Sequence, residues 1–204
     1  MTFSGLQLGL DCAMDAALTS AGFRRTALGT WSRRRSQEIS VIQFQKHSGD
    51  PRFCVNLGIH YGFLPKAGTE ALLDGDQIEL HECELVLRLT DLPADKDQWW
   101  PISEMSIAPV ANLVVTRGLA VFDLYRLDGE LAAFDAKGIE GNNLGLLAPI
   151  TKVRASLLLS RLHEHLGNHE KCIEAARIGL KLAGMAVGPK KALKDILRRF
   201  GQPA

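Results

Sequence analysis

Two sets of side chains in this sequence have types and spacings that suit chemistry. The polar set follows two segments with strand-like alternation and consists of Gln43, Gln45, Asn56 and His60. Amide and imidazole groups donate and accept hydrogen bonds, so this set suits a polar ligand or a peptide. The basic set consists of Trp31, Arg33 and Arg35. Guanidinium groups beside an indole are typical of sites that bind phosphate or stack on a base.

Each set also has a structural alternative, which the sequence leaves open. The amides would equally bond one another or a loop that covers them. Arginines on an outer strand protect a sheet edge, because charges there block unwanted strand pairing. An acidic protein partner is a third role for the arginines.

Histidines near the end of the chain have little metal-binding character. The candidate ligands are His163, His165, His169 and Cys172. A break at Gly167-Asn168 separates His165 from His169, so the two do not lie one turn apart on one helix. The zinc pattern also lacks a second cysteine-rich half. We therefore expect no metal site and no cofactor.

Catalytic signatures are similarly weak. His81 and Cys83 share one face of a predicted strand, but Glu82 and Glu84 point the other way, so no carboxylate orients the histidine. A glycine-rich phosphate loop, a nucleophile elbow and a zinc-protease motif are all missing from the sequence. The sequence therefore leans against an enzyme.

The elements that must position the polar set form an antiparallel hairpin. Residues 52–60 alternate between apolar and polar types, which predicts a half-buried strand. The composition of 48–51 predicts a turn. Pairing Phe44 with Val55 places the apolar side chains on one face and Gln43 opposite Asn56, whereas a slip of one residue would mix the two sets.

Helical spacing predicts the rest of the layout. A first helix begins with the capping pattern Ser4–Gln7 and ends at Gly22. A strand over 79–89 follows the hairpins. The further predicted helices are Pro109–Tyr125, 130–137 and three after 145, the first and third opened by Pro149 and Pro189.

The order of these elements predicts an α+β fold. It has an N-terminal helix, an antiparallel meander sheet of about four to five strands packed on helices, and an all-helical C-terminal extension. The glycine- and asparagine-rich stretch 138–145 is the best candidate boundary. We expect an α+β domain over 1–137, a linker over 138–148 and a helical extension over 149–204, packed on the first domain.

Composition is that of a soluble globular protein. The 204 residues are 46% hydrophobic and carry a formal net charge of +1, which gives no global argument for nucleic acid or membrane. Charge is segregated, being basic over 24–46 and acidic over 70–104. Cys12, Cys54 and Cys83 are expected to be small buried residues without a disulfide framework. With no secretory signal and no membrane span in the sequence, we expect a cytoplasmic location.

Several segments resemble a known bacterial family. They are GFRR at 22–25, Trp31, VIQFQK at 41–46, FCVNLG at 53–58, Cys83, Arg88 and WWPI at 99–102. Over Leu10 to Tyr125 the chain resembles domain-of-unknown-function family 4304. The resemblance implies a small bacterial cytoplasmic α+β domain and assigns no catalytic or binding residue.

The C-terminal tail resembles a single tetratricopeptide-type helical hairpin. Small residues at Ser160, Cys172 and Gly179 fall where such helices pack closely, and Leu166-Gly167-Asn168 occupies the turn. One hairpin is not an array, since about three repeats are needed for a solenoid. The alternative is two ordinary packed helices that complete the core.

Three functions remain open at this level. The first is a non-enzymatic binding or interaction protein, an adaptor or an immunity-like protein, whose partner is another protein. The alternative is a nucleic-acid-associated protein that uses Trp31, Arg33 and Arg35. A further alternative is an enzyme whose pocket is lined by Gln43, Asn56 and His60.

Overall fold

The chain forms two compact units, Met1–Asp123 and Leu124–Ala204, which are described separately below. The computed structural model describes residues 1–66, 69, 71–73, 78–91 and 97–203. Parts of the predicted loop 61–75 and of the acidic stretch 70–104 lie outside the described residues.

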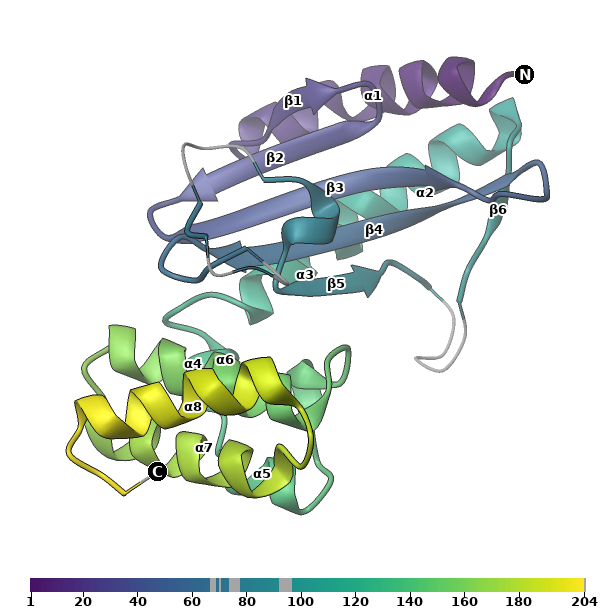
Figure 1. Ribbon diagram of the computed structural model, residues 1–204. Helices are drawn as coiled ribbons and strands as arrows, with labels where there is room; N and C mark the ends of the chain where they lie inside the picture. The colour runs from purple at the N-terminus through teal and green to yellow at the C-terminus, as the bar shows by residue number, and fades with distance from the viewer. Residues whose placement is uncertain (67–68, 70, 74–77, 92–96, 204) are drawn as a thin grey trace. The chain divides into compact units, whose positions relative to one another are not determined.

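The first unit is an antiparallel sheet backed by helices, which confirms the predicted α+β class (Figure 1). Its strands are β1 (Arg24–Ala27), β2 (Thr30–Arg35), β3 (Glu38–Lys46), β4 (Arg52–Tyr61), β5 (Leu85–Arg88) and β6 (Trp100–Pro101). The strand order is β1-β2-β3-β4-β5, and β6 pairs with β4. The helices are α1 (Phe3–Ser20), η1 (Leu80–Glu82), η2 (Glu104–Ser106), α2 (Ile107–Leu113), η3 (Val114–Gly118) and α3 (Leu119–Leu124).

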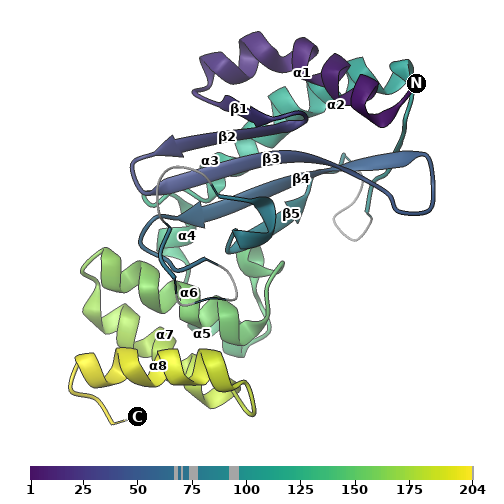
Figure 2. The ribbon, with the colours of Figure 1, turned by 45° about the horizontal axis from the view of Figure 1, so that its top comes forward.

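The predicted register of the central hairpin is confirmed. Phe44 pairs with Val55, and Gln43 lies opposite Asn56. The apolar face, which we call the core face, includes the buried residues Ile42, Phe44, Val55 and Leu57. Helices α1 and α2 lie behind the sheet on this side (Figures 1 and 2). The opposite face, which we call the front face, carries Gln43 and Asn56.

Helix α1 begins and ends for local reasons. Its N-cap is Thr2, whose hydroxyl accepts a hydrogen bond from the Gly5 amide, so the predicted capping residue Ser4 is wrong. Ser4 lies inside the first turn, and the side chain that can reach back to an unpaired amide belongs to Thr2. Gly22 follows the helix with φ of +83°, a conformation that glycine adopts without strain. Cys12 is exposed rather than buried, because it lies outside the stripe Leu6, Leu10, Met14 and Leu18.

The front face is covered by η1 over part of its area. Gly58 of β4 makes this possible, because a Cβ atom there would lie 2.7 Å from the Cys83 Sγ and 2.9 Å from a Leu80 methyl. Cys83 and Ile78 pack with Ile39 and Val41 of β3 in one apolar cluster. The predicted strand 79–89 is therefore only half right, since residues 80–82 form a 3-10 turn and β5 begins at Leu85.

The helical run Glu104–Leu124 covers part of the core face. Val110 and Val114 are buried, and Phe122 lies with its ring centre 5.6 Å from that of Phe23. By length and composition this run could cross a membrane, a test that core helices also pass. Pro109 lies in the first turn of α2, as proline prefers.

The second unit is helical throughout its regular elements. They are α4 (Glu130–Ala133), α5 (Lys137–Glu140), η4 (Gly145–Leu147), α6 (Lys152–His165), α7 (His169–Leu182) and α8 (Val187–Arg199). Helices α6, α7 and α8 share a core of Cys172, Ala176, Leu193, Ile196 and Leu197. A Cβ atom on Gly179 would lie 2.7 Å from the Ser156 Cβ, so α6 and α7 approach closely there.

The division between the units differs from the predicted linker 138–148. Helix α5 contacts both α6 and α7, and the Tyr125 hydroxyl donates to the Leu146 carbonyl at 2.8 Å. The glycines and asparagines of this stretch form turns inside the helical unit, where Asn142 and Gly145 have positive φ. Composition identifies a turn, but only contacts decide whether a turn separates domains.

Candidate functional site

Part of the front face carries polar side chains that η1 does not cover. Asn56 is buried, and its Nδ2 donates to the Gln45 Oε1 at 2.8 Å. Gln43 lies directly opposite Asn56 in the register, yet the hydrogen bond of the Asn56 side chain runs diagonally across the strands to Gln45. The sequence therefore predicted correctly which strands and which face carry these amides. It did not predict that Asn56 bonds to Gln45, its diagonal neighbour. The thiol of Cys54 lies 3.6 Å from the Gln45 carbonyl oxygen and completes this row.

Arg88 joins the amides from the next strand. It pairs with Asn56 across β4 and β5, so both side chains lie on the front face. Its guanidinium carbon lies 4.8 Å from the centre of the Trp99 ring, within the range of a cation–π contact. Its Nε lies 3.9 Å from an Asp97 carboxylate oxygen. Its Nη1 is buried and has no hydrogen-bond partner within the described part of the chain.

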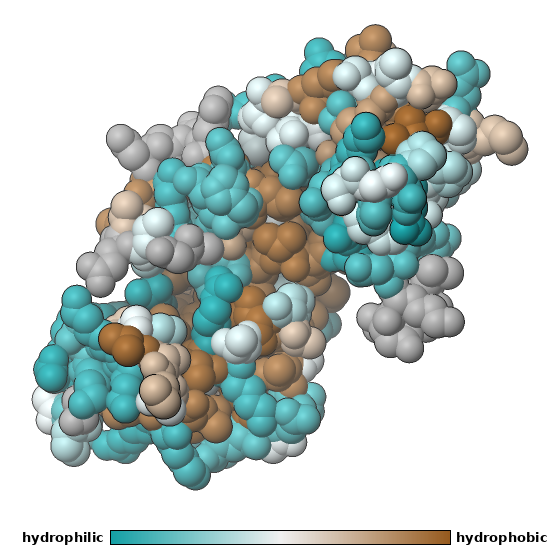
Figure 3. All heavy atoms as spheres, turned by 45° about the vertical axis from the view of Figure 1, so that its right-hand side comes forward, coloured by the Kyte–Doolittle hydropathy of each residue, from teal (hydrophilic) through white to brown (hydrophobic). Residues whose placement is uncertain are grey.

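Trp99 is the aromatic centre of this region. The His47 ring meets it edge-on at 4.8 Å, and the Arg52 guanidinium lies 5.7 Å from its centre. We call the set Gln43, Gln45, Asn56, Arg88 and Trp99 the amide–arginine surface. Figure 3 brings the side of the β3–β4 turn forward and shows hydrophilic residues gathered there.

A separate hollow of about 430 Å³ lies at the β3–β4 turn, and no residue of the amide–arginine surface lines it. Its walls are the turn Lys46–Pro51, the N-terminal residues Met1–Phe3 and Ile102. His47 fixes the turn, because its Nδ1 accepts hydrogen bonds from the amides of Gly49 and Asp50, both at 3.1 Å.

Sequence reasoning did not select Arg88 or Trp99 for this site. The signal for Arg88 was its alternation against Leu85, Leu87 and Leu89, which places it on the polar face once β5 pairs with β4. Trp99 offers no such signal, because its position depends on the path of the chain between β5 and β6.

His60 does not join the amide–arginine surface. It is fully buried, and neither ring nitrogen has a hydrogen-bond partner among the described residues. Burial lowers the pKa of His60 from 6.5 to about 4, and the charge of Glu82 opposes this only in part. His60 is therefore neutral at pH 7 and has no open access.

The predicted pair of His81 and Cys83 is not brought together on a strand. His81 is exposed on η1, while Cys83 is buried after it. Burial raises the pKa of the Cys83 thiol to about 12, which keeps it protonated and unreactive.

Trp31, Arg33 and Arg35 lie on the core face and meet α1. Trp31 is 1% exposed, and its Nε1 donates to the Asp11 carboxylate at 2.8 Å. The Arg33 guanidinium is buried 4.5 Å from the centre of the Phe23 ring. Stacking of Trp31 or Arg33 on a nucleic-acid base is thus blocked by packing, which corrects the hypothesis of an accessible Trp–Arg row.

Arg35 is the exposed member of the predicted row. Both Arg33 and Arg35 donate to the Ala21 carbonyl oxygen, at 3.3 and 3.5 Å. This oxygen lies at the C-terminal end of α1, where positive charge is stabilised by the helix dipole. The two arginines therefore hold the helix end to the sheet.

In the helical unit, the histidines do not gather around a common point. His163 is buried, whereas His165 and His169 are exposed on either side of the turn at Gly167. Among the described residues no group of three His, Cys, Asp or Glu side chains could hold a metal ion.

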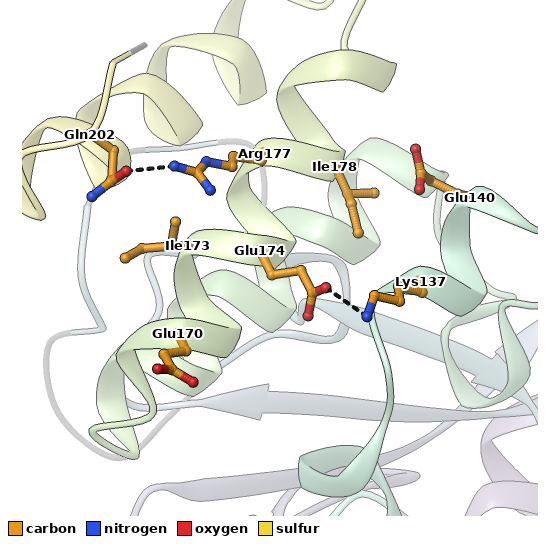
Figure 4. Close-up of a pocket in the computed structure, with 8 residues that line it drawn as sticks. All are labelled: Lys137, Glu140, Glu170, Ile173, Glu174, Arg177, Ile178 and Gln202. Carbon is orange, nitrogen blue, oxygen red and sulfur yellow. Dashed lines mark hydrogen bonds and ion pairs between the residues drawn. The ribbon is translucent and has the colours of Figure 1, made fainter.

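A groove of about 490 Å³ runs along α7 of this unit (Figure 4). Glu174 and Lys137 point toward each other across it and form an ion pair at 3.3 Å. Arg177 donates to the Gln202 side chain at its other end. Its charged walls are largely neutralised by one another, so the groove itself has little preference for an ion.

Fold and site together define an α+β domain whose antiparallel sheet is backed by helices on one face and carries a partly open polar surface on the other. A family model described as a domain of unknown function (DUF4304) matches residues 14–117, and the chain belongs to this family. That range contains the whole amide–arginine surface. Comparisons with curated proteins and with solved structures gave no match.

Proposed function

We propose that this chain is a non-enzymatic binding protein whose amide–arginine surface docks a protein partner with acidic side chains. The observation that carries the proposal is the position of Arg88, beside Asn56 and over Trp99 on the front face, where Gln45 is exposed. Sheet faces are normally covered by another layer, and this part of the face is polar and partly exposed.

Charge favours an acidic partner. The Arg88 side chain is 24% exposed, and the Arg52 guanidinium lies 5.7 Å from the centre of the same Trp99 ring. Hydrogen bonds to charged groups contribute about 1.5–3 kcal/mol each, so a carboxylate placed here would be recognised strongly. Trp99 offers a flat apolar anchor of the kind that is enriched in interface hot spots.

The amides suit a protein partner better than a phosphate backbone. Gln43 and Gln45 offer both donors and acceptors, which match the peptide groups and side chains of a protein surface. Two members of the basic set, Trp31 and Arg33, are buried in the packing between the sheet and its helices. They are therefore not available to bind nucleic acid.

On this proposal the chain is a bacterial, cytoplasmic adaptor or immunity-like protein. The helices α6 and α7 would serve as one tetratricopeptide-like pair, with α8 covering its open side. Support comes from the small residues, because Ser160 and Cys172 are fully buried and Gly179 leaves no room for a Cβ atom.

Photo-crosslinking in cells tests the proposal. A photoreactive amino acid replaces Gln45, which is exposed on the surface, or Lys194 of α8 as the control position. We expect one discrete protein adduct from position 45 that is absent from position 194. Arg88→Gln and Trp99→Ala should each abolish it, whereas Arg198→Gln, which removes an exposed arginine of the helical unit, should leave it unchanged.

Three outcomes would overturn the proposal. One is an adduct that persists in both Arg88→Gln and Trp99→Ala. Another is labelling at position 45 no stronger than at position 194. The third is an adduct with nucleic acid alone, which a steep salt dependence of binding would confirm.

A further inference from the structure

The two outer strands of the sheet differ in how they are protected. Strand β5 is the outermost strand on one side, as Figure 1 shows, and β1 is the outermost on the other. Strand β1 carries Arg24 and Arg25, and its register with β2 shifts after Arg25. Charges and bulges of this kind block the addition of a further strand. Strand β5 has the sequence LVLR and an even register with β4, so it carries little such protection.

The ladder between β4 and β5 fixes the direction of the backbone groups on β5. The Leu89 amide donates to the Val55 carbonyl at 2.9 Å, so Leu89 bonds toward β4. Backbone groups of successive residues in an antiparallel strand point to opposite sides, so Leu87 also bonds toward β4. Val86 and Arg88 therefore direct their N–H and C=O groups away from β4, to the open side of β5.

The backbone groups of Val86 and Arg88 have no hydrogen-bond partner in the part of the chain that the structure describes. Strand β6 does not cover them, because it pairs with Arg52 and Phe53 at the other end of β4. Val86 is 40% exposed, so solvent reaches the sheet here. Two donors and two acceptors in a row form a template on which an extended chain can add as another strand.

The side chains of β5 determine which residues suit such a segment. Residues that pair across strands lie on the same face, so a residue opposite Arg88 would lie beside its guanidinium on the front face. A residue opposite Leu87 would lie on the core face, where Leu87 is only half-buried. An acidic side chain suits the first position, and an apolar side chain suits the second.

We propose that the partner adds an extended segment to β5 as a further strand, with acidic and apolar side chains in alternation. The inference rests on the proposed function, because Arg88 belongs to the amide–arginine surface. It adds the conformation and the sequence pattern of the segment that binds. Main-chain hydrogen bonds to Val86 and Arg88 provide affinity, and the alternating side chains provide specificity.

The size of the edge favours a partner protein over a second copy of this chain. Pairing of β5 with β5 would join only the four residues of each strand. Stable dimers bury about 800 Å² on each partner, which is more than so short a strand offers. A partner that also contacts the amide–arginine surface gains the remaining area from the front face.

Titration of the full chain with defined peptides tests the inference. The probe is an acetylated heptapeptide amide that alternates aspartate with valine, and NMR follows the backbone amide signals of Val86 and Arg88. We expect a saturable shift of both signals. A peptide that alternates lysine with valine should bind at least about tenfold more weakly, because it cannot supply a carboxylate to Arg88.

Methylated peptides test whether the main chain of the segment pairs with β5. The aspartates lie opposite Val86 and Arg88, so their backbone N–H groups point toward β5 and those of the valines point away. Methylation of the aspartate nitrogens should abolish binding, whereas methylation of the valine nitrogens should leave it unchanged.

Val86→Pro tests the same hydrogen bonds from the side of the protein. Proline removes the outward N–H of residue 86 and no ladder bond, a position at which outer strands tolerate it. Binding should weaken about three- to tenfold, as expected for the loss of one hydrogen bond. Val86→Thr keeps this N–H and should bind as the wild type does, and urea unfolding checks that both variants are folded.

Four results would overturn the inference. The first is the absence of a saturable shift with the aspartate–valine peptide. The second is equal binding of the two methylated peptides, and the third is unchanged affinity in Val86→Pro. The fourth is self-association without peptide that Val86→Pro abolishes in analytical ultracentrifugation, which would assign the edge to a second copy.

The crosslinked adduct from position 45 separates this inference from the proposed function. We expect Val86→Pro to weaken the adduct and Val86→Thr to preserve it. An adduct that is lost in Arg88→Gln but fully kept in Val86→Pro would refute the added strand and leave the proposed function standing. Lack of any specific adduct in the wild type would refute the proposed function itself.

Discussion

Asp11 is a buried carboxylate that ties helix α1 to the β1–β2 hairpin. Its Oδ1 accepts from Trp31 Nε1 at 2.8 Å, and its Oδ2 accepts from the Gly29 amide at 3.0 Å. In Asp11→Asn one carboxylate oxygen becomes an NH₂ group, which donates and cannot accept. Either the Gly29 amide or the Trp31 Nε1 then loses its acceptor. We expect the free energy of unfolding to fall by about 1–3 kcal/mol, the cost of an unsatisfied buried group.

Urea unfolding followed by Trp fluorescence measures this loss. The matched control is Asp15→Asn, one turn further along α1, where the side chain is exposed. Surface substitutions of this kind change stability by less than about 0.5 kcal/mol. Equal stability of Asp11→Asn and Asp15→Asn would show that the carboxylate does not hold the hairpin.

His60 predicts a dependence of stability on pH. Its pKa is about 4 in the folded protein and 6.5 as the ordinary value, so between these pH values the unfolded chain binds more protons. The contribution of neutral His60 to the free energy of unfolding is therefore fully present above pH 6.5, and it is lost as the pH falls toward 4. The shift corresponds to about 3 kcal/mol.

A comparison of urea unfolding at pH 7 and pH 4.5 checks this dependence. In His60→Leu the contribution of this imidazole is absent, so the difference between the two pH values should shrink by about 2.5 kcal/mol, most of the full shift. Some acid sensitivity should remain from His163, whose pKa burial also lowers. An unchanged difference would mean that His60 is protonated without cost in the folded state.

Single residues were partly predictable from sequence. Alternation placed Gln43 and Asn56 on one face correctly, because a period of two has only one register that keeps apolar side chains together. The burial of Trp31 and Arg33 was not predicted, because their partners Asp11, Phe23 and Phe122 lie far away in sequence. Local spacing cannot reveal which face of a strand a distant helix will cover.

At the level of elements, the approach of η1 to the sheet depends on Gly58. In Gly58→Ala the new Cβ would lie 2.7 Å from the Cys83 Sγ, closer than packed atoms allow. We expect η1 to move off β4 and stability to fall by about 1–3 kcal/mol, as in other overpacked sites. Hydrogen exchange should show the loss first at the Cys83 amide, which donates to the Leu80 carbonyl.

Gly49→Ala is the control for this change. Its nearest neighbours would be His47 ring atoms at 3.8 Å, an ordinary contact, and its φ is not positive. Stability should therefore stay the same or rise slightly. Unaltered exchange at Cys83 in Gly58→Ala would contradict the proposed close approach.

The same contact explains why the segment 79–89 was only half predicted. Its alternating apolar residues fit a strand, and Leu85–Arg88 do pair with β4. Residues 80–82 instead turn over Gly58, whose missing side chain leaves room for them. A sequence pattern shows alternation along one segment. The turn at residues 80–82 depends instead on the space that Gly58 leaves on a different strand, β4.

For the whole molecule, each unit has its own core. Residues Leu6, Leu10 and Leu57 are buried in the first, and Leu158, Leu162 and Leu193 in the second. Composition predicted two parts but placed the linker at 138–148, because turn residues there resemble a linker. Short helices before that stretch belong to the second unit through contacts that composition does not encode.

These contacts lead to a prediction about fragments. Residues 124–204 should fold cooperatively alone, whereas 149–204 should not, because it lacks the fully buried Leu131, Ile139 and Leu147. Each loss of a large buried side chain costs about 2–5 kcal/mol, against a total stability of about 5–15 kcal/mol. Circular dichroism during urea unfolding distinguishes a sigmoidal transition from a gradual one. Cooperative unfolding of 149–204 with the stability of 124–204 would instead place the boundary at 138–148.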